Sequence, residues 1–242
     1  MVSPNKLSVC PHDTAKNLLG WFTLNTYLQR MLEFTMHFEP QDNFLVERQH
    51  VLDVEHHVVY ANPYSAVVFA RDRGFVALAR PRGVFDETVL VKKAGTSLPA
   101  QPRIASATDK LVIHNLGLTL LPGLGIDAAT ATFSFVGNHM NAAKAVLRGD
   151  ADLAFVFNET WSGMNASTRA EFEVLAETRD GAAFHCFMVA PAWADKAEAI
   201  RAVLVGMQDD PAGKRILDDL RFSGFDAVTE ADMAGAARVV QL

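Results

Sequence analysis

The sequence predicts an α/β fold with two lobes, each a mostly parallel sheet flanked by helices. Short apolar runs alternate with amphipathic stretches along the chain, the β-α-β pattern from which such sheets are built. The alternation is interrupted by Gly95, Pro99 and Pro102 and then begins again. The chain has 242 residues, 50% of them hydrophobic, which is enough for two separate cores.

In the first alternating stretch, a short polar turn leads from each strand into a helix. Asp13 or Thr14 can cap the first helix, which extends to Arg30. Pro63 suits the first turn of a later helix, which extends to Arg71. The expected strands are Leu7–Cys10, Thr35–Phe38, His57–Tyr60, Phe75–Ala79 and Thr88–Lys92, and Phe44–Leu52 is a further expected helix.

Beyond Pro102 the alternation resumes and then gives way to a helical tail. The expected strands are Arg103–Ala105, Thr132–Phe135, Leu153–Phe157, Val174–Glu177 and Ala183–Val189, and the expected helices are Thr108–Leu121 and Asn138–Leu147. The tail, Ala194 to Leu242, is expected to be nearly all helical, with Asp195 and Asp232 as caps.

Charge and hydropathy exclude several classes of partner. The formal net charge is -6, and the acidic residues are spread along the chain, which argues against nucleic acid and against an anionic membrane surface. No apolar run approaches the ~20 residues that span a bilayer, so no membrane insertion is expected. Met1 to Ser8 lacks a basic and an apolar region, so no signal peptide is visible.

The most specific pattern lies between Gly137 and Ala154. A glycine turn and His139 open a helix, which closes with Val146-Leu147-Arg148-Gly149-Asp150-Ala151-Asp152 before a strand. This pattern resembles the phosphate, phosphite and phosphonate family of solute-binding proteins of ABC transporters. Three further segments resemble parts of the family's sequences and occur along the chain in the same order as in the family. They are Tyr60 to Ser65, Arg103 to Asp109, and Met207 to Gly213 with Gly224-Phe225.

The resemblance covers Leu7 to Asp232 and implies a type II periplasmic-binding fold with a ligand cleft at its hinge. It further implies that residues 1–98 begin lobe 1, residues 99–188 form lobe 2, and residues 189–242 return to lobe 1. A protein of this kind closes on its ligand and delivers it to a membrane permease. We therefore expect a periplasmic monomer without cofactor or catalytic activity, whose export signal has been removed; a cytoplasmic location is the alternative.

In the second lobe, Ser106, Thr108 and His139 are the expected ligand-binding residues. Ser106 and Thr108 lie between a strand and the next helix, where hydroxyls and helix amides suit a tetrahedral oxyanion. The alternative is an ordinary N-cap by Thr108 or Asp109. His139 is included because it matches the ligand-binding His of the family.

Asn158 and Glu159 follow the strand that ends at Phe157 and occupy a place where the family has polar and acidic residues. A carboxylate there would select a ligand that carries a proton or a cationic group. The alternative is that Asn158 caps a helix with Glu159 in its first turn. Tyr60 is expected to line the pocket from the first lobe, with core packing as its alternative.

Cys10, His12 and Asp13 end the first strand, and His12 and Asp13 are expected to face the ligand. Cys10 and His12 could instead bind a soft metal or a thiophilic oxyanion such as arsenite, provided that His185 or Cys186 came close. The spacing contains no metal motif, so no metal site is predicted. A strand-end Cys also serves as a small buried hydrophobe.

Three hypotheses about function remain open at the level of sequence. The first is a transporter solute-binding protein for phosphate, phosphonate or a related oxyanion. The second is a ligand-sensing domain of the same fold that signals to a partner. The third is an enzyme that shares the fold; the sequence has no Gly-x-Ser-x-Gly, phosphate-loop or His-Glu-x-x-His motif to support it.

Overall fold

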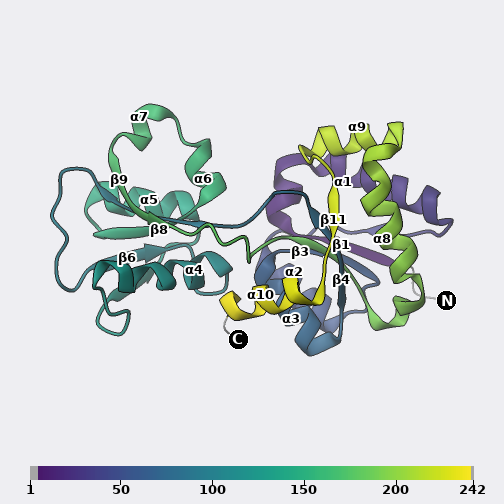
Figure 1. Cartoon of the computed structure of the whole chain (residues 1–242), viewed down its shortest axis with the longest axis horizontal. Helices are drawn as coiled ribbons and strands as arrows, with labels where there is room; N and C mark the ends of the chain where they lie inside the picture. Colours follow the sequence, from purple (N-terminus) through teal and green to yellow (C-terminus); the bar gives the residue numbers. More distant parts are fainter. Residues whose placement is uncertain (1–4, 241–242) are drawn as a thin grey trace. The chain divides into compact units, whose positions relative to one another are not determined.

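The computed structural model describes residues 5–240, which form two compact α/β units (Figure 1). Within them, unit 1 comprises residues 5–84 and 184–237, and unit 2 comprises residues 85–183 and 238–240. The predicted α/β fold with two sheets is confirmed, but the sheets are mixed and not mostly parallel, because β5 (Thr88–Lys93), β10 (Cys186–Val189) and β11 (Phe225–Ala227) pair antiparallel with their neighbours. The units divide earlier in the chain than the predicted boundaries at 98/99 and 188/189, because the Gly- and Pro-rich stretch 94–102 connects two strands of unit 2.

Unit 1 contains a mixed sheet in the order β11-β4-β10-β3-β1-β2. Its strands are β1 (Lys6–Val9), β2 (His37–Phe38), β3 (Val58–Ala61), β4 (Val76–Pro81), β10 (Cys186–Val189) and β11 (Phe225–Ala227). β1 pairs in parallel with β2 and β3, whereas β10 runs antiparallel between β3 and β4. The strand that follows the return to unit 1 is therefore inserted into the middle of the sheet.

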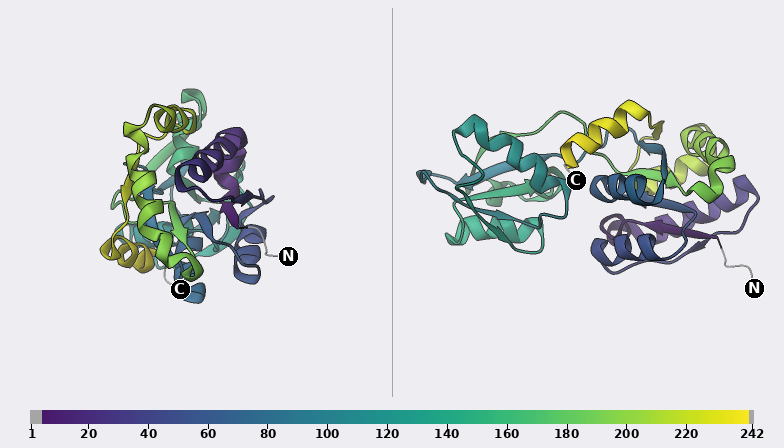
Figure 2. Two further views of the ribbon diagram at one scale, coloured as in Figure 1. Left: turned by 90° about the vertical axis from the view of Figure 1, so that its right-hand side faces the viewer. Right: turned by 90° about the horizontal axis from the view of Figure 1, so that it is seen from below.

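Helices cover both faces of the unit 1 sheet. They are α1 (Pro11–Leu32), α2 (Phe44–Asp53), α3 (Pro63–Arg73), α8 (Ala197–Gly206) and α9 (Pro211–Leu220), with short 3-10 turns η2 (Pro191–Lys196) and η3 (Met207–Asp209). The last helix, α10 (Glu230–Val240), begins in unit 1 and ends with residues of unit 2. α1 packs against α8 and α9, and α8 covers β4 and β11 (Figure 1). On the other face α3 packs on β3, β4 and β10, and α2 lies beside it (Figure 2, right).

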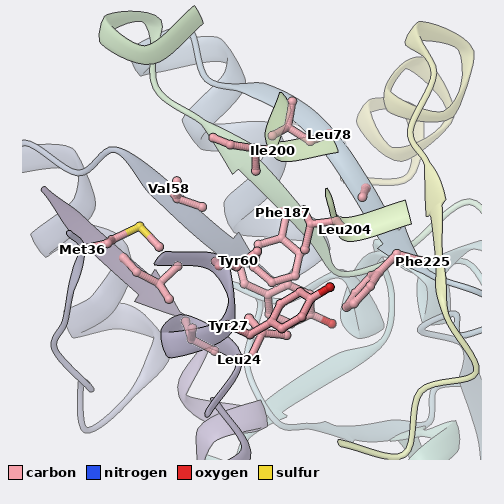
Figure 3. Packing of buried hydrophobic residues seen from close by; sticks show 14 of the residues in the cluster. Leu24, Tyr27, Met36, Val58, Tyr60, Leu78, Phe187, Ile200, Leu204 and Phe225 are labelled. Carbon is pink, nitrogen blue, oxygen red and sulfur yellow. The ribbon is translucent and has the colours of Figure 1, made fainter. Parts of the chain in front are cut away.

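Aromatic rings fill the main core of unit 1. The Tyr60 ring lies 4.6 Å from the Trp21 ring and 4.9 Å from the Phe187 ring, and Phe187 packs in turn on Phe225 at 5.4 Å between centroids. Figure 3 shows Tyr60, Phe187 and Phe225 gathered with Tyr27 in this core. Strands β3, β10 and β11 are thus held to α1 by one continuous cluster.

Unit 2 contains a mixed sheet in the order β7-β6-β8-β5-β9. Its elements are β5 (Thr88–Lys93), β6 (Arg103–Ser106), α4 (Val112–Leu120), η1 (Leu121–Leu124), β7 (Thr132–Phe135), α5 (His139–Arg148), β8 (Leu153–Phe157), α6 (Asn158–Gly163), α7 (Ala166–Arg169) and β9 (Phe172–Glu177). β6 pairs in parallel with β7 and β8, and β5 runs antiparallel to β8 and β9. α5 packs on one face of the sheet and α4 on the other (Figure 1).

Two predicted elements differ from the structure. The tail is not continuously helical, because Phe225–Ala227 forms strand β11 at the edge of the unit 1 sheet. The helix predicted from Thr108 begins only at Val112, because the Thr108 hydroxyl accepts a hydrogen bond from Lys110 N (3.2 Å) in a local turn. Within residues 5–240, no helix combines the length and the apolar character needed to cross a bilayer.

Candidate functional site

The first group of candidate residues lies at the carboxyl edge of the unit 1 sheet. β1 and β3 are adjacent parallel strands, so the turns that follow them meet at this edge, and Cys10 N donates to Tyr60 O at 2.8 Å. β10 is antiparallel to β3, with Cys186 opposite Ala61, so the chain that enters β10 starts at the same edge. This pairing brings His185 to the turn that begins at Cys10.

Cys10, Asp13 and His185 form a compact group, which we call the Cys10–Asp13–His185 cluster. One side-chain atom from each residue, the thiol sulfur, a carboxylate oxygen and an imidazole nitrogen, lies within 4.8 Å of the other two. His185 Nδ1 is 2.8 Å from Asp13 Oδ2, and Lys16 Nζ is 3.6 Å from Asp13 Oδ1. Cys10 and Asp13 are buried, and His185 is mostly so.

The environment shifts the pKa values of the Cys10 thiol and the Asp13 carboxyl in opposite directions. Burial raises the pKa of the Cys10 thiol well above its usual value, and the carboxylates of Asp13 and Glu47 raise it further. Burial alone would also raise the pKa of Asp13, but the charge and hydrogen bond of His185, together with Lys16, lower it. The buried thiol is therefore protonated at neutral pH, which argues against Cys10 as a nucleophile.

A chain of buried hydrogen bonds holds the cluster in place. Asn62, the N-cap of α3, accepts from Ser65 N (2.9 Å), donates to Ser65 Oγ (3.1 Å) and contacts Cys10 Sγ at 3.7 Å. Arg48 Nε donates to the same hydroxyl of Ser65 at 2.9 Å. Glu47, also buried, accepts from Ser8 Oγ at 3.1 Å, and burial raises its pKa to about 7.

His12 and Tyr60, the other two predicted residues of unit 1, lie outside the Cys10–Asp13–His185 cluster. His12 is exposed in the first turn of α1, with its ring 6.4 Å from the ring of His185. Tyr60 is only 1% exposed and belongs to the core, where it packs on Trp21 and Phe187 and has its ring 5.7 Å from the His185 ring. Tyr60 thus supports His185 from within the core.

The carboxyl edge of the unit 2 sheet brings Ser106, Thr108 and His139 into neighbouring turns. β6 and β7 remain paired beyond their ends, since Val136 N donates to Ser106 O (3.0 Å) and Gly137 N to Ala107 O (2.9 Å). α5 begins directly after, with its amino end at this edge. Asn138 caps α5 by accepting from Asn141 N at 2.8 Å, and the half-buried His139 packs 5.7 Å from the Phe157 ring.

Asn158 and Glu159 occupy the end of β8 but have different roles in the structure. Asn158 Oδ1 accepts from Glu87 N (3.2 Å), and Asn158 Nδ2 donates to Phe85 O (3.1 Å). Its amide thereby fastens the segment that leads into β5. Glu159 is exposed in the first turn of α6.

Sequence reasoning missed three buried polar residues near these edges. Glu47 and Arg48 were read only as part of a helix, and Glu87 was not considered. Glu87 accepts from Gly181 N (2.9 Å) and from the Thr178 hydroxyl, so it ties the segment that precedes β5 to the segment that follows β9. The sequence signal for a buried charge was a charged residue directly beside an apolar strand, as Glu87 is beside Thr88–Lys93.

Comparison with known proteins identifies a family and a fold. The family model described as ABC transporter, phosphonate, periplasmic substrate-binding protein matches residues 7–233. No curated protein matches the chain.

Solved structures share the whole fold at low sequence identity. The Xanthomonas citri protein XAC2383 bound to chloride is 17% identical, with a TM-score of 0.78 and 98% of each chain covered. The same protein is also known bound to ATP, with a TM-score of 0.74. PhnD1 from Prochlorococcus marinus in complex with methylphosphonate is 13% identical, with a TM-score of 0.73 and 98% and 97% of the two chains covered. The aliphatic sulphonate-binding protein SsuA from Escherichia coli is 12% identical, with a TM-score of 0.68 and 99% and 91% covered.

Proposed function

The chain belongs to the phosphonate family of periplasmic substrate-binding proteins of ABC transporters, and from this we propose that it captures a small oxyanion for delivery to a membrane permease. The observation that carries the proposal is the family match over residues 7–233, which includes both units. We further propose that the protein acts in the periplasm as a monomer without catalytic activity.

The carboxyl edge of unit 2 supports an anion as the ligand. Thr108 presents a half-buried hydroxyl there, and the amino end of α5 presents main-chain N–H groups together with the partial positive charge of the helix. Ser106 is 0% exposed, and its hydroxyl donates to Thr108 O at 3.5 Å, so it supports this turn from inside the unit. His139 stands at the first position of that helix and adds an imidazole donor. These groups are the proposed anion-binding residues, with Asn158 as a positioning residue.

The carboxyl edge of unit 1 supports selection among anions. Asp13 is a buried carboxylate with a lowered pKa, and it is therefore charged at neutral pH. A fully ionised dianion near it would be repelled, whereas a ligand with a protonated oxygen or a cationic substituent would not. His12, Asp13 and Glu159 are the proposed residues for this discrimination. The proposed mechanism is ligand-driven closure, in which the ligand stabilises one compact conformation.

A melting-temperature screen tests the proposal, because a ligand that binds the native state raises its stability by mass action. The ligands are methylphosphonate, phosphate, an alkanesulfonate and ATP, chosen from the solved relatives and the family. We expect methylphosphonate or phosphate to raise the melting temperature at millimolar concentration and to make the protein more compact in small-angle scattering. If no oxyanion shifts the melting temperature, the proposed function is wrong.

Two matched pairs of variants assign the residues. Thr108→Ala and His139→Ala should weaken binding at least about 10-fold, since each removes a hydrogen bond to a charged ligand. Ser134→Ala and His37→Ala remove an exposed hydroxyl and an exposed imidazole elsewhere and should leave affinity unchanged. Equal affinity in all four variants would show that the anion binds at other residues.

A further inference from the structure

Outside the proposed anion-binding residues, the Cys10–Asp13–His185 cluster combines three different metal-ligand types in one place. Two of its members come from a single turn, in which Cys10 is the N-cap of α1 and Asp13 N donates to Cys10 O at 2.9 Å. The third, His185, is brought in by the pairing of β10 with β3. The cluster lies wholly within unit 1.

The distances suit a small ion with tetrahedral preference. Zn²⁺ holds sulfur, nitrogen and oxygen ligands about 2.0–2.3 Å away, which separates neighbouring ligand atoms by roughly 3–4 Å. The three ligand atoms here lie within 4.8 Å of one another, and the Asp13–His185 pair at 2.8 Å would have to lengthen slightly. Shifts of about 1 Å, within the reach of side-chain rotation, would complete the geometry.

The charges around the cluster favour a divalent cation. A Cys10 thiolate and the Asp13 carboxylate together balance two positive charges, and the α1 amino end supports a thiolate at its N-cap. Glu47 is 0% exposed and acts electrostatically on both Cys10 and His185. Its Oε2 atom has no hydrogen-bond partner within residues 5–240, so a buried carboxylate oxygen that acts on the cluster lacks a hydrogen bond.

We propose that Cys10, Asp13 and His185 bind a divalent cation of the zinc type. The thiolate and imidazole select a borderline-soft ion over Mg²⁺ and Ca²⁺, which prefer oxygen ligands. Binding replaces the S–H bond of Cys10 by a sulfur–metal bond and releases the thiol proton to solvent. Water or the neighbouring His12 completes the coordination. The site shares Asp13 and His12 with the residues proposed to discriminate among anions, whereas Ser106, Thr108 and His139 of unit 2 take no part in it.

The test uses the full chain, freed of metal by a chelator and dialysed. Co²⁺ is the first probe, because a thiolate ligand produces an intense charge-transfer absorption in the near ultraviolet. Zn²⁺ binding is then measured by calorimetry, with no oxyanion present. We expect the charge-transfer absorption with Co²⁺ and saturable binding of one Zn²⁺ per chain.

Variants separate this site from other thiols and imidazoles. Cys10→Ser should lose the Co²⁺ absorption, and His185→Gln should weaken Zn²⁺ binding on the order of 100-fold, since each removes one of three protein ligands. Cys186→Ser changes a thiol that is equally buried, and His37→Gln changes an exposed imidazole; both should bind like the wild type.

The outcome remains decisive if Cys10→Ser does not fold. Cys186→Ser then contains Cys10 as its single thiol and must still show the Co²⁺ absorption. Absence of that absorption in Cys186→Ser, or unchanged Zn²⁺ affinity in both Cys10→Ser and His185→Gln, would overturn the proposal. Loss of Zn²⁺ binding without loss of methylphosphonate binding would leave the proposed transport function intact.

Discussion

The carboxyl edges of the two sheets have similar strand-to-helix turns, but the polar side chains in these turns are buried to different degrees. In unit 1 the polar side chains are buried and bonded to one another, from Arg48 through Ser65 and Asn62 to Cys10. In unit 2, Asn138 is exposed and His139 half-buried at the amino end of α5. The first edge is therefore expected to contribute stability and a rigid arrangement of charges, whereas the second keeps donors accessible to a ligand.

The largest difference in the free energy of unfolding is expected between alanine substitutions at two arginines, one in each unit. Arg48 is buried, donates to Ser65 Oγ at 2.9 Å and lies 4.4 Å from the centre of the Tyr64 ring. Arg48→Ala should cost about 3 kcal/mol, because it removes packing, a cation–π contact and a buried hydrogen bond. In unit 2, Arg103 forms an exposed ion pair with Asp152 at 2.8 Å, and Arg103→Ala should leave the melting temperature near that of the wild type.

Chemical denaturation followed by tryptophan fluorescence measures this difference. Trp21 and Trp193 report on unit 1, and Trp161 reports on unit 2. Equal destabilisation by Arg48→Ala and Arg103→Ala would show that the buried network contributes no more than a surface ion pair.

A buried histidine should make unit 1 sensitive to acid. Burial lowers the pKa of His56 from its usual 6.5 to about 4, and its Nδ1 donates to Val54 O at 3.0 Å. Because the unfolded chain binds the proton more readily, stability is complete above pH 6.5 and is lost as the pH falls towards 4. The free energy of unfolding should fall by about 3 kcal/mol in total.

The pH dependence of urea unfolding checks this expectation. His56→Gln should flatten the profile between pH 6.5 and pH 4, whereas the exposed His37→Gln should reproduce the wild-type profile. An unchanged slope in His56→Gln would show that other groups cause the acid sensitivity.

The smallest losses of stability are expected for alanine substitutions at two asparagine N-caps with the same local geometry. Asn62 accepts from Ser65 N at 2.9 Å and Asn138 from Asn141 N at 2.8 Å. Asn138→Ala should cost about 1 kcal/mol, the usual value for an N-cap. Asn62→Ala should cost about 2 kcal/mol, since Asn62 is buried and also donates to Ser65 Oγ.

Thermal unfolding monitored by circular dichroism compares the two caps. Asn62→Asp and Asn138→Asp are the controls, because aspartate keeps the capping oxygen and differs only in charge and in the lost donor. Equal losses in the two alanine variants would contradict the idea that the same turn is embedded differently in the two units.

Most of the elements could be predicted from local pattern, as β1, β3, α3 and α5 illustrate. Their apolar runs, Pro63 and the capping asparagines act over a few residues, and such signals are legible in the sequence. β11 could not be predicted, because Phe225–Ala227 is too short to show alternation and becomes a strand only by pairing with β4. The late start of α4 likewise depends on one turn at Thr108.

The candidate residues show the same division. The position of His139 at the opening of α5 could be predicted, because it is a local property of the sequence. The sequence could not show that Tyr60 is buried in the core or that Asn158 is bound to the backbone of Phe85 and Glu87. Both facts depend on residues that are far away in the sequence.

By itself, the sequence determined the α/β class, the strand-to-helix turns and the family. These follow from periodicity, from caps and from one motif, which act within a few turns of the chain. Only the tertiary structure decided that His185 lies beside Cys10 and Asp13, because that contact requires β10 to insert antiparallel between β3 and β4. The insertion buries both faces of the strand, a gain that depends on residues far apart in the sequence.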